Sequence, residues 1–242
     1  MANEIEKASG IAIGSIEKVN GRTDDNIQAL QGLEFTGATE FMTTTGGNTS
    51  ADDGDYKVIT FTSSGNFDVT VGTDGTYGDK VEYLIVAGGG GAGIADGGYG
   101  ANGGGGAGGF RVNTSYTVTS QRYTITVGGG GAGQAGESIG NGTKGSNSVI
   151  SPASGSAITA TGGGEGKYAT GTSAGPAGGD GGSGAGGSGA GRSGGSGNEG
   201  SYSPSEGNNG GAGSAYSDGS NGGGGGGAGA VGSDGPTGGN GT

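Results

Sequence analysis

The residues that could do chemistry in this 242-residue chain are carboxylates, hydroxyls and tyrosines, because histidine, cysteine and tryptophan are absent. Without histidine or cysteine, the chain cannot build a Ser-His-Asp triad, a cysteine nucleophile or a Cys/His zinc site. Acidic pairs that hydrolyse glycosides could still be brought together by the fold, but no pair stands out in the sequence. We therefore expect a non-enzymatic protein with no catalytic residues, no metal ligands and no cofactor.

One glycine motif matches a nucleotide-binding signature in residue type and spacing. Gly88, Gly90 and Gly93 follow a predicted strand in the spacing of the dinucleotide fingerprint. That fingerprint needs a helix whose N-terminus faces the pyrophosphate, and residues 94–98 are poor helix formers. Since 60 of the 72 glycines follow residue 87, such matches also arise by chance. The motif does not predict cofactor binding.

Three tyrosines, Tyr168, Tyr202 and Tyr216, are surrounded in the sequence by glycine, serine and aspartate. We therefore do not expect them to belong to a hydrophobic core. An exposed tyrosine ring can stack on a sugar or grip a protein loop at low entropy cost, as in antibody loops. An equally weighted alternative is that the rings wedge between glycine segments as spacers. The candidate receptor-contacting residues are Tyr168, Arg192, Tyr202, Tyr216 and Asp218.

The composition excludes several classes of protein. Hydrophobic residues make up 28% and charged residues 13% of the chain, against roughly 45–50% and about 25% in ordinary domains. The net charge of −12, with basic residues spread singly, disfavours nucleic-acid binding. No stretch of 18 apolar residues predicts membrane insertion, and the first residues do not resemble a secretory signal. We expect a protein made in a cytoplasm.

Three segments are predicted from the distribution of glycine and of large side chains: 1–37, 38–161 and 162–242. In the first, Thr23 can cap a short helix of about eight residues, too short to be stable alone. Its apolar residues are expected to pack on another protein, and a frayed arm is the alternative. The candidate attachment residues are Ile11, Ile13, Ile16, Val19, Ile27, Leu30 and Leu33.

The middle segment is predicted to be an all-β domain of a sandwich or jelly-roll type. Residues 67–71 and 122–127 alternate apolar and polar side chains, which indicates strands with one buried face. Residues 56–62 and 81–87 are denser in apolar residues and favour central strands buried on both faces. Further strands are predicted over 110–119, 148–150 and 157–161. The aromatic residues expected in the core are Phe61, Phe67, Tyr83, Phe110 and Tyr123.

The glycine-rich parts need a different source of order. Glycine-dense connections of about 20 residues follow Ala87 and Val127, longer than loops in compact domains. Residues 162–242 lack large side chains, so ordering them requires hydrogen bonds between backbones. Extended helices with three residues per turn can pack closely where glycine removes the side chain. We predict a polyglycine II-type bundle with loops exposed at its ends.

Four segments, 81–91, 103–110, 123–131 and 141–148, resemble the glycine-rich domain of bacteriophage tail-fibre and receptor-binding proteins. The remaining glycine-rich chain is similar, more loosely, to the tips of T-even-like tail-fibre adhesins, in which polyglycine II bundles display receptor-binding loops. Residues 1–37 resemble N-terminal segments by which small phage proteins attach to the virion.

The resemblance implies a virion protein of the tail, baseplate or neck. Residues 1–37 would bind other virion proteins, and a homotrimer is expected. The glycine-rich tip would bind a bacterial surface polysaccharide or outer-membrane protein without catalysis. The alternatives are a decoration, neck or connector fibre without a receptor, and a polysaccharide depolymerase. Ice binding is disfavoured, because the chain lacks regular three-residue repeats and cysteines.

Overall fold

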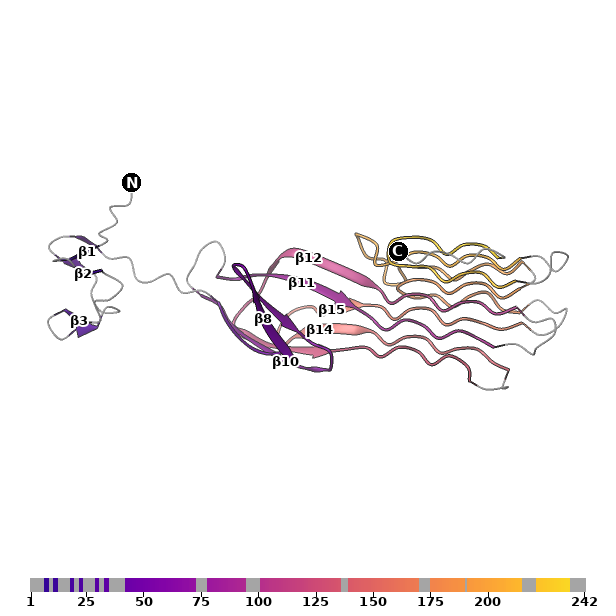
Figure 1. The fold of residues 1–242 in the computed structure, drawn as a ribbon, viewed down its shortest axis with the longest axis horizontal. Helices are drawn as coiled ribbons and strands as arrows, with labels where there is room; N and C mark the ends of the chain where they lie inside the picture. Colours follow the sequence, from indigo (N-terminus) through magenta and orange to yellow (C-terminus); the bar gives the residue numbers. More distant parts are fainter. Residues whose placement is uncertain are drawn as a thin grey trace.

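The secondary structure is entirely β in the part of the chain that the computed structural model describes (Figure 1). Six two-residue strands occur before residue 35, and the rest of the description begins at residue 42. The described ranges from there on are 42–72, 78–94, 101–135, 139–169, 175–189, 191–214 and 221–235. The predicted all-β class is confirmed, while its finer assignment to a sandwich or jelly roll stays a prediction.

The largest sheet has five antiparallel strands in the order β15-β14-β13-β10-β7. Its members are β7 (Thr43–Gly46), β10 (Gly65–Thr70), β13 (Gln121–Thr126), β14 (Ser148–Pro152) and β15 (Ile158–Ala160). The alternation predicted for residues 67–71 and 122–127 is confirmed by β10 and β13. Val69 and Tyr123 of these strands are buried, as the pattern requires.

A second pair, β11 (Lys80–Val86) and β12 (Phe110–Thr117), forms an antiparallel ribbon. Ile85 of β11 is buried together with Ala160 of β15, and Ile150 packs on the same cluster. A second cluster joins Val69, Val118 and Tyr123. Because both clusters contain residues of the ribbon region and of the main sheet, the ribbon and the sheet pack around a shared core.

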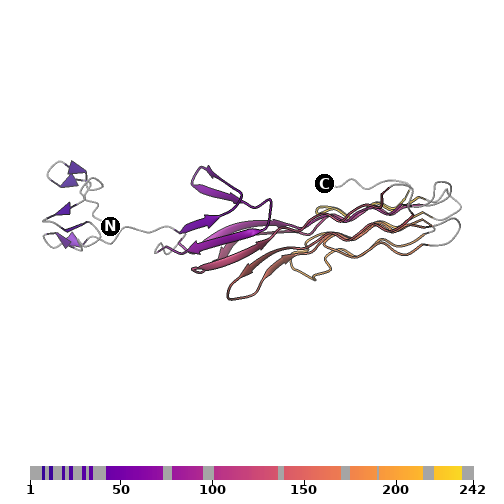
Figure 2. The same ribbon diagram turned by 90° about the horizontal axis from the view of Figure 1, so that it is seen from below.

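Two predicted central strands are not central. Residues 56–62 contribute β9 (Tyr56–Thr60), which among the described strands pairs only with β8 (Thr49–Asp53) and leaves nearly all of its residues exposed. This hairpin stands clear of the main sheet (Figure 2). Residues 81–87 contribute β11, which pairs only with β12 within the described chain and buries one face. Local apolar density was therefore a poor guide to burial on two faces.

The core prediction for the aromatic residues was correct only in part. Tyr123 is 2% exposed, and Phe67 and Tyr83 are partly buried against the two clusters. Phe61 meets Phe67 edge to face, with ring centroids 6.2 Å apart. Phe110, in contrast, is 41% exposed, because it lies on the outer face of β12.

The glycine-dense connections are not loops. Backbone segments 87–94, 101–109, 127–135, 139–147 and 161–169 leave or enter the ends of strands β11 to β15 and continue side by side (Figure 1). Segments 175–189, 191–198, 206–214 and 221–227 join them through backbone hydrogen bonds. We call these segments the glycine runs and their assembly the bundle. The bundle therefore includes chain from both the predicted middle segment and the predicted C-terminal segment.

Lateral hydrogen bonds in the bundle recur every three residues. The amides of Gly88, Gly91 and Ile94 donate to the carbonyls of Ser146, Thr143 and Gly140 at 3.0, 2.9 and 2.9 Å. The intervening amides of Ala87 and Gly90 donate to a different run, at Gly109 and Gly106. This spacing is the period of an extended helix with three residues per turn and no internal hydrogen bonds.

The centre of the bundle is the run 181–189, in which every residue is buried. It contains only glycine, serine and alanine, so neighbouring backbones approach it closely. Its two serine hydroxyls are satisfied, since Ser183 Oγ donates to the Gly227 carbonyl at 3.1 Å and Ser188 Oγ to the Pro176 carbonyl at 2.8 Å. A larger side chain would have no space here.

The N-terminal segment forms three small antiparallel hairpins. They are β1 (Lys7–Ala8) with β2 (Ile11–Ala12), β3 (Lys18–Val19) with β4 (Arg22–Thr23), and β5 (Ala29–Leu30) with β6 (Leu33–Glu34). The helix predicted from Thr23 is wrong, because Thr23 ends β4 and Leu30 ends β5. The backbone at Thr23 and at Ala29–Leu30 is instead extended and paired with a neighbouring strand.

We expect Gly186→Ala to destabilise the protein, by about 1–3 kcal/mol or more, because overpacking strains a close-packed interior. A methyl group at residue 186 would overlap the carbonyl oxygen of Gly223. The control is Gly129→Ala, whose methyl group would meet no atom within 4 Å and should stabilise slightly through the unfolded chain. Urea unfolding of both variants tests this. Equal stability of the two would contradict the packing described here.

Candidate functional site

The glycine runs end together at one end of the bundle, away from the sheets (Figure 1). Ile94 and Gly140 exchange two backbone hydrogen bonds of 2.9 Å, and Asn102 bridges to Tyr168. The amide of Gly191 donates to the Ser214 carbonyl at 2.9 Å. We call this region the distal end. It brings together residues far apart in the sequence, such as Asn102 and Gly222.

Tyr168 and Arg192, two of the predicted receptor-contacting residues, belong to the distal end. The Tyr168 amide donates to Asn141 Oδ1 at 3.4 Å, and the residue is half-buried. Arg192 is exposed, and its carbonyl accepts from the Gly213 amide at 2.8 Å. The backbone thus fixes both residues in position, while the Arg192 side chain faces solvent.

Tyr202 lies elsewhere, next to strand β12. The guanidinium of Arg111 lies 3.8 Å from the centre of the Tyr202 ring, in a cation–π contact. Arg111 Nη1 also donates to the Thr159 carbonyl at 2.7 Å. These contacts hold the Tyr202 ring against Arg111 of β12. The remaining candidates, Tyr216 and Asp218, lie outside the described residues.

The candidate attachment residues are also distributed over described and undescribed positions. Ile11 lies in β2, Val19 in β3, Leu30 in β5 and Leu33 in β6. Ile13, Ile16 and Ile27 lie outside the described residues.

An ion pair lies within the run that leads to Tyr168. Lys167 Nζ is 2.5 Å from Glu165 Oε1, and each side chain is about one-fifth exposed (21% and 22%). Burial raises the pKa of Glu165, but the hydrogen bond from Lys167, a backbone hydrogen bond and the charges of Lys167 and Lys144 lower it more. The net pKa lies below the ordinary value, so Glu165 is a carboxylate at neutral pH and unsuited to act as a general acid.

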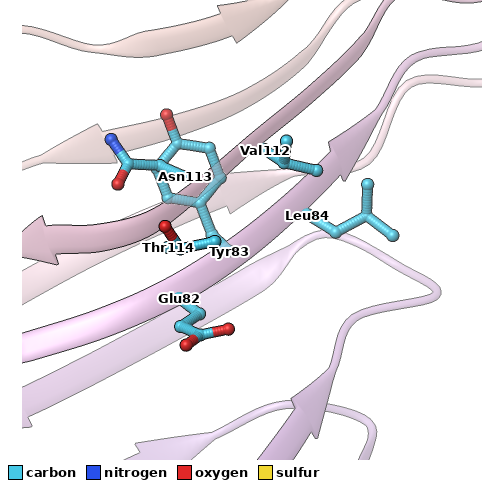
Figure 3. A pocket seen from close by; sticks show the side chains of 6 residues that line it. All are labelled: Glu82, Tyr83, Leu84, Val112, Asn113 and Thr114. Atoms are coloured by element: carbon cyan, nitrogen blue, oxygen red, sulfur yellow. The ribbon is translucent and has the colours of Figure 1, made fainter.

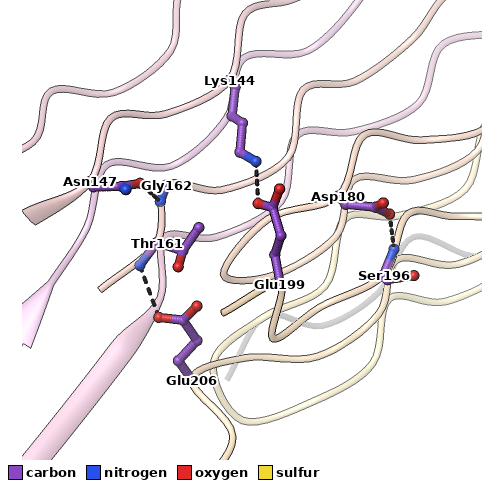
Figure 4. A network of polar contacts seen from close by, with 8 residues as sticks. All are labelled: Lys144, Asn147, Thr161, Gly162, Asp180, Ser196, Glu199 and Glu206. Atoms are coloured by element: carbon purple, nitrogen blue, oxygen red, sulfur yellow. Dashed lines mark hydrogen bonds and ion pairs between the residues drawn. The ribbon is translucent and has the colours of Figure 1, made fainter. Parts of the chain in front are cut away.

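At the opposite end of the bundle, polar side chains replace backbone partners where runs turn (Figure 4). Asn147 Oδ1 accepts from the Gly162 amide at 2.8 Å, and Asp180 Oδ1 from the Ser196 amide at 2.6 Å. Lys144 pairs with Glu199 on the surface. These contacts tie the turns to the runs, which is a structural role.

Glu206 is the most unusual member of this network, because it is 1% exposed. Its Oε2 accepts from the Thr161 amide at 2.8 Å, and its carbonyl accepts from the Phe110 amide at 2.8 Å. Its Oε1 has no hydrogen-bond partner among the described residues. Glu206 thus joins the connection between runs 191–198 and 206–214 to β12 and to the residue that follows β15.

A shallow hollow of about 260 Å³ lies on the outer face of the β11–β12 ribbon (Figure 3). The lining residues are Glu82, Tyr83, Leu84, Val112, Asn113 and Thr114. It contains a single carboxylate, whereas glycoside hydrolysis uses a pair about 5–9.5 Å apart. Two of the lining residues, Leu84 and Val112, pair across the ribbon, and next to them Val86 pairs with Phe110. All four are at least 41% exposed, so they form a continuous apolar face.

The described ranges give little support for metal binding, membrane insertion or nucleotide binding. They contain no group of three or more acidic, cysteine or histidine residues that could hold a metal ion. None of their elements is a helix long and apolar enough to cross a membrane. Gly88, Gly90 and Gly93 lie in an extended glycine run rather than at a strand-to-helix turn, so the phosphate-binding context of the fingerprint is missing.

Comparison with known proteins agrees with this architecture. Residues 60–242 match a family described as a glycine-rich domain, and this match covers most of the chain. The protein therefore belongs to the glycine-rich domain family. No curated protein and no solved structure shows significant similarity to it.

We expect Glu206→Ala to lower the free energy of unfolding by about 1–3 kcal/mol, because it leaves the buried Thr161 amide without an acceptor. Glu206→Gln keeps an oxygen that can accept from that amide, so it should be more stable than Glu206→Ala. Glu199→Ala is the surface control, since an exposed ion pair contributes less than about 1 kcal/mol. Thermal unfolding measures all three, and a stable Glu206→Ala variant would refute the anchoring role.

Proposed function

We propose that this protein is a non-catalytic adhesin of a bacteriophage virion and that the distal end of the bundle contacts the bacterial surface. The observation that carries the proposal is the convergence of run ends at one end of a frame held by main-chain hydrogen bonds. A frame of this kind draws most of its order from the main chain rather than from side chains. Exposed turns on a rigid scaffold are common binding sites.

The proposed conformation of the runs is polyglycine II. Its support is the three-residue recurrence of lateral hydrogen bonds and the buried, side-chain-poor run 181–189. Its function is stiffness: each backbone is held by several neighbours, so the distal end keeps a defined shape.

The proposed receptor is a surface polysaccharide or an outer-membrane protein. Tyr168 offers an aromatic ring, and Arg192 an exposed cation that can bind carboxylate or phosphate groups of such a surface. Residues 215–220, which include Tyr216 and Asp218, connect runs 206–214 and 221–227. They therefore follow directly on a run that ends at Ser214, in the distal end.

The test is binding of the purified, fluorescently labelled chain to host cells. We expect the double variant Tyr168→Ala with Arg192→Ala to lose at least tenfold in apparent affinity, because it removes an aromatic and a charged contact. Tyr56→Ala is the matched control, because Tyr56 is exposed on β9, away from the distal end. This substitution should leave the apparent affinity for cells unchanged.

The outcomes separate the alternatives. If the wild-type chain does not bind cells, and virions that lack it adsorb normally, the protein is a decoration or connector fibre. Release of oligosaccharide from host polysaccharide would indicate a depolymerase. Equal loss in Tyr56→Ala and in the double variant would refute the assignment of the distal end.

We further propose that copies of the chain associate, as a homotrimer, through the apolar face formed by Leu84, Val86, Phe110 and Val112. Contiguous exposed apolar patches commonly mark interfaces. Leu84→Asp should therefore yield a monomer, because it buries a charge in the contact. Val231→Asp is the control, since Val231 is exposed on the bundle. Light scattering gives the mass of each, and a monomeric wild type would refute the proposal.

A further inference from the structure

The three N-terminal hairpins correspond to an internal repeat of eleven residues. The repeat units are 5–15, 16–26 and 27–37. Each begins with isoleucine, at Ile5, Ile16 and Ile27, followed by Glu6, Glu17 or Gln28. The fourth position is aliphatic in every unit (Ala8, Val19, Leu30), and the sixth is glycine (Gly10, Gly21, Gly32). The period is uninterrupted, with no residue between units.

The structure repeats in the same register. In each unit the third residue pairs with the eighth, and the fourth with the seventh: Lys7 with Ala12, Lys18 with Thr23, and Ala29 with Glu34 for the outer pairs. Two residues connect the strands of every hairpin, and the second is always glycine. Such connections favour glycine, because hairpin turns need a positive φ there. Sequence and topology therefore define three equivalent units.

One unit is too small to act alone. A hairpin with two-residue strands buries little surface, and isolated hairpins are marginal even when longer. Repeat arrays gain their stability from neighbouring units, with about three needed. Three units in tandem are thus near the minimum for an ordered segment.

Equivalent units also present equivalent surfaces. A partner with one site would engage one unit, and the others would add nothing to the contact. A partner that offers the same site several times engages all of them, and the second and third contacts are then intramolecular. Repetition of a whole unit, including its turn and its aliphatic positions, therefore fits a repeated site.

We propose that units 5–15, 16–26 and 27–37 bind equivalent sites on a symmetric homo-oligomeric virion protein, one unit to each protomer. Each partner site would offer an apolar contact for the shared isoleucine and aliphatic positions. This inference rests on the proposed virion attachment and adds its mechanism, which is multivalent binding by short units. It differs from attachment through one continuous surface, in which the units would not be interchangeable.

The test uses the full chain and virions that lack it. Retention of labelled protein on sedimented particles shows attachment, and dilution gives the half-life of the complex. Deleting residues 16–26 removes one unit and joins its neighbours in register. We expect this variant to dissociate about 100-fold faster, because one of three linked contacts is lost.

A unit swap is the matched control. Replacing residues 16–26 by a second copy of residues 5–15 keeps three units and changes most positions of the middle one. Retention close to that of the wild type is expected. Unfolding of the bundle should be unchanged in both variants, which confirms that the remaining chain is folded.

The outcomes distinguish the two proposals. If the wild-type chain is not retained on particles, virion attachment and this inference both fail. If the wild-type chain is retained but deletion leaves the half-life unchanged, or the unit swap abolishes retention, attachment stands and the equivalence of the units is refuted.

Discussion

Hydrogen bonding between backbones of neighbouring glycine runs is the interaction on which this protein depends. Ordering a residue costs about 1–2 kcal/mol in conformational entropy, and glycine loses more than any other residue. A net gain of about 0.5–1.5 kcal/mol per hydrogen bond offsets this only if nearly every buried amide and carbonyl finds a partner. The bundle meets this condition with several neighbours around a run: 87–94, for example, bonds to four others, 101–109, 127–135, 139–147 and 161–169. A single glycine run in solution would have no such partners.

The sheets supply what the bundle cannot, which is a starting register. Strands β11 to β15 are set by side-chain alternation and by the clusters around Val69 and Ile85. The register of the paired strands fixes where each adjoining glycine run begins. The three-residue hydrogen-bond periods of neighbouring runs therefore match from their first residues. Backbone hydrogen bonding is therefore continuous from the sheets into the bundle. Hydrophobic side chains pack in the sheet region, and almost none pack in the bundle.

The strands with one buried face were predictable from the sequence, because period-2 alternation in 67–71 and 122–127 reports burial directly. The exposed hairpin β8–β9 was not, since apolar density at Tyr56 and Val58 shows preference for a strand but not whether a partner covers it. Composition made the runs after Ala87 and Val127 look like loops, because their order comes from chain segments far away in sequence. Burial of Glu206 likewise depends on a turn that folds back onto β12. The eleven-residue repeat is present in the sequence itself, but the capping signal at Thr23 predicts a helix across the second and third units, which conflicts with the hairpin period.

Close packing of backbones also separates the positions that can vary from those that cannot. Within the runs, a Cβ at most glycines would overlap a neighbouring carbonyl, as at Gly90, Gly103 and Gly186. Some connecting residues are limited too, since a Cβ at Gly200 would overlap the Tyr202 ring. Glu206 shows that a side chain at the start of a run can also be required, since its carboxylate accepts from the Thr161 amide. The frame thus draws most of its stability from main-chain atoms, which every residue possesses.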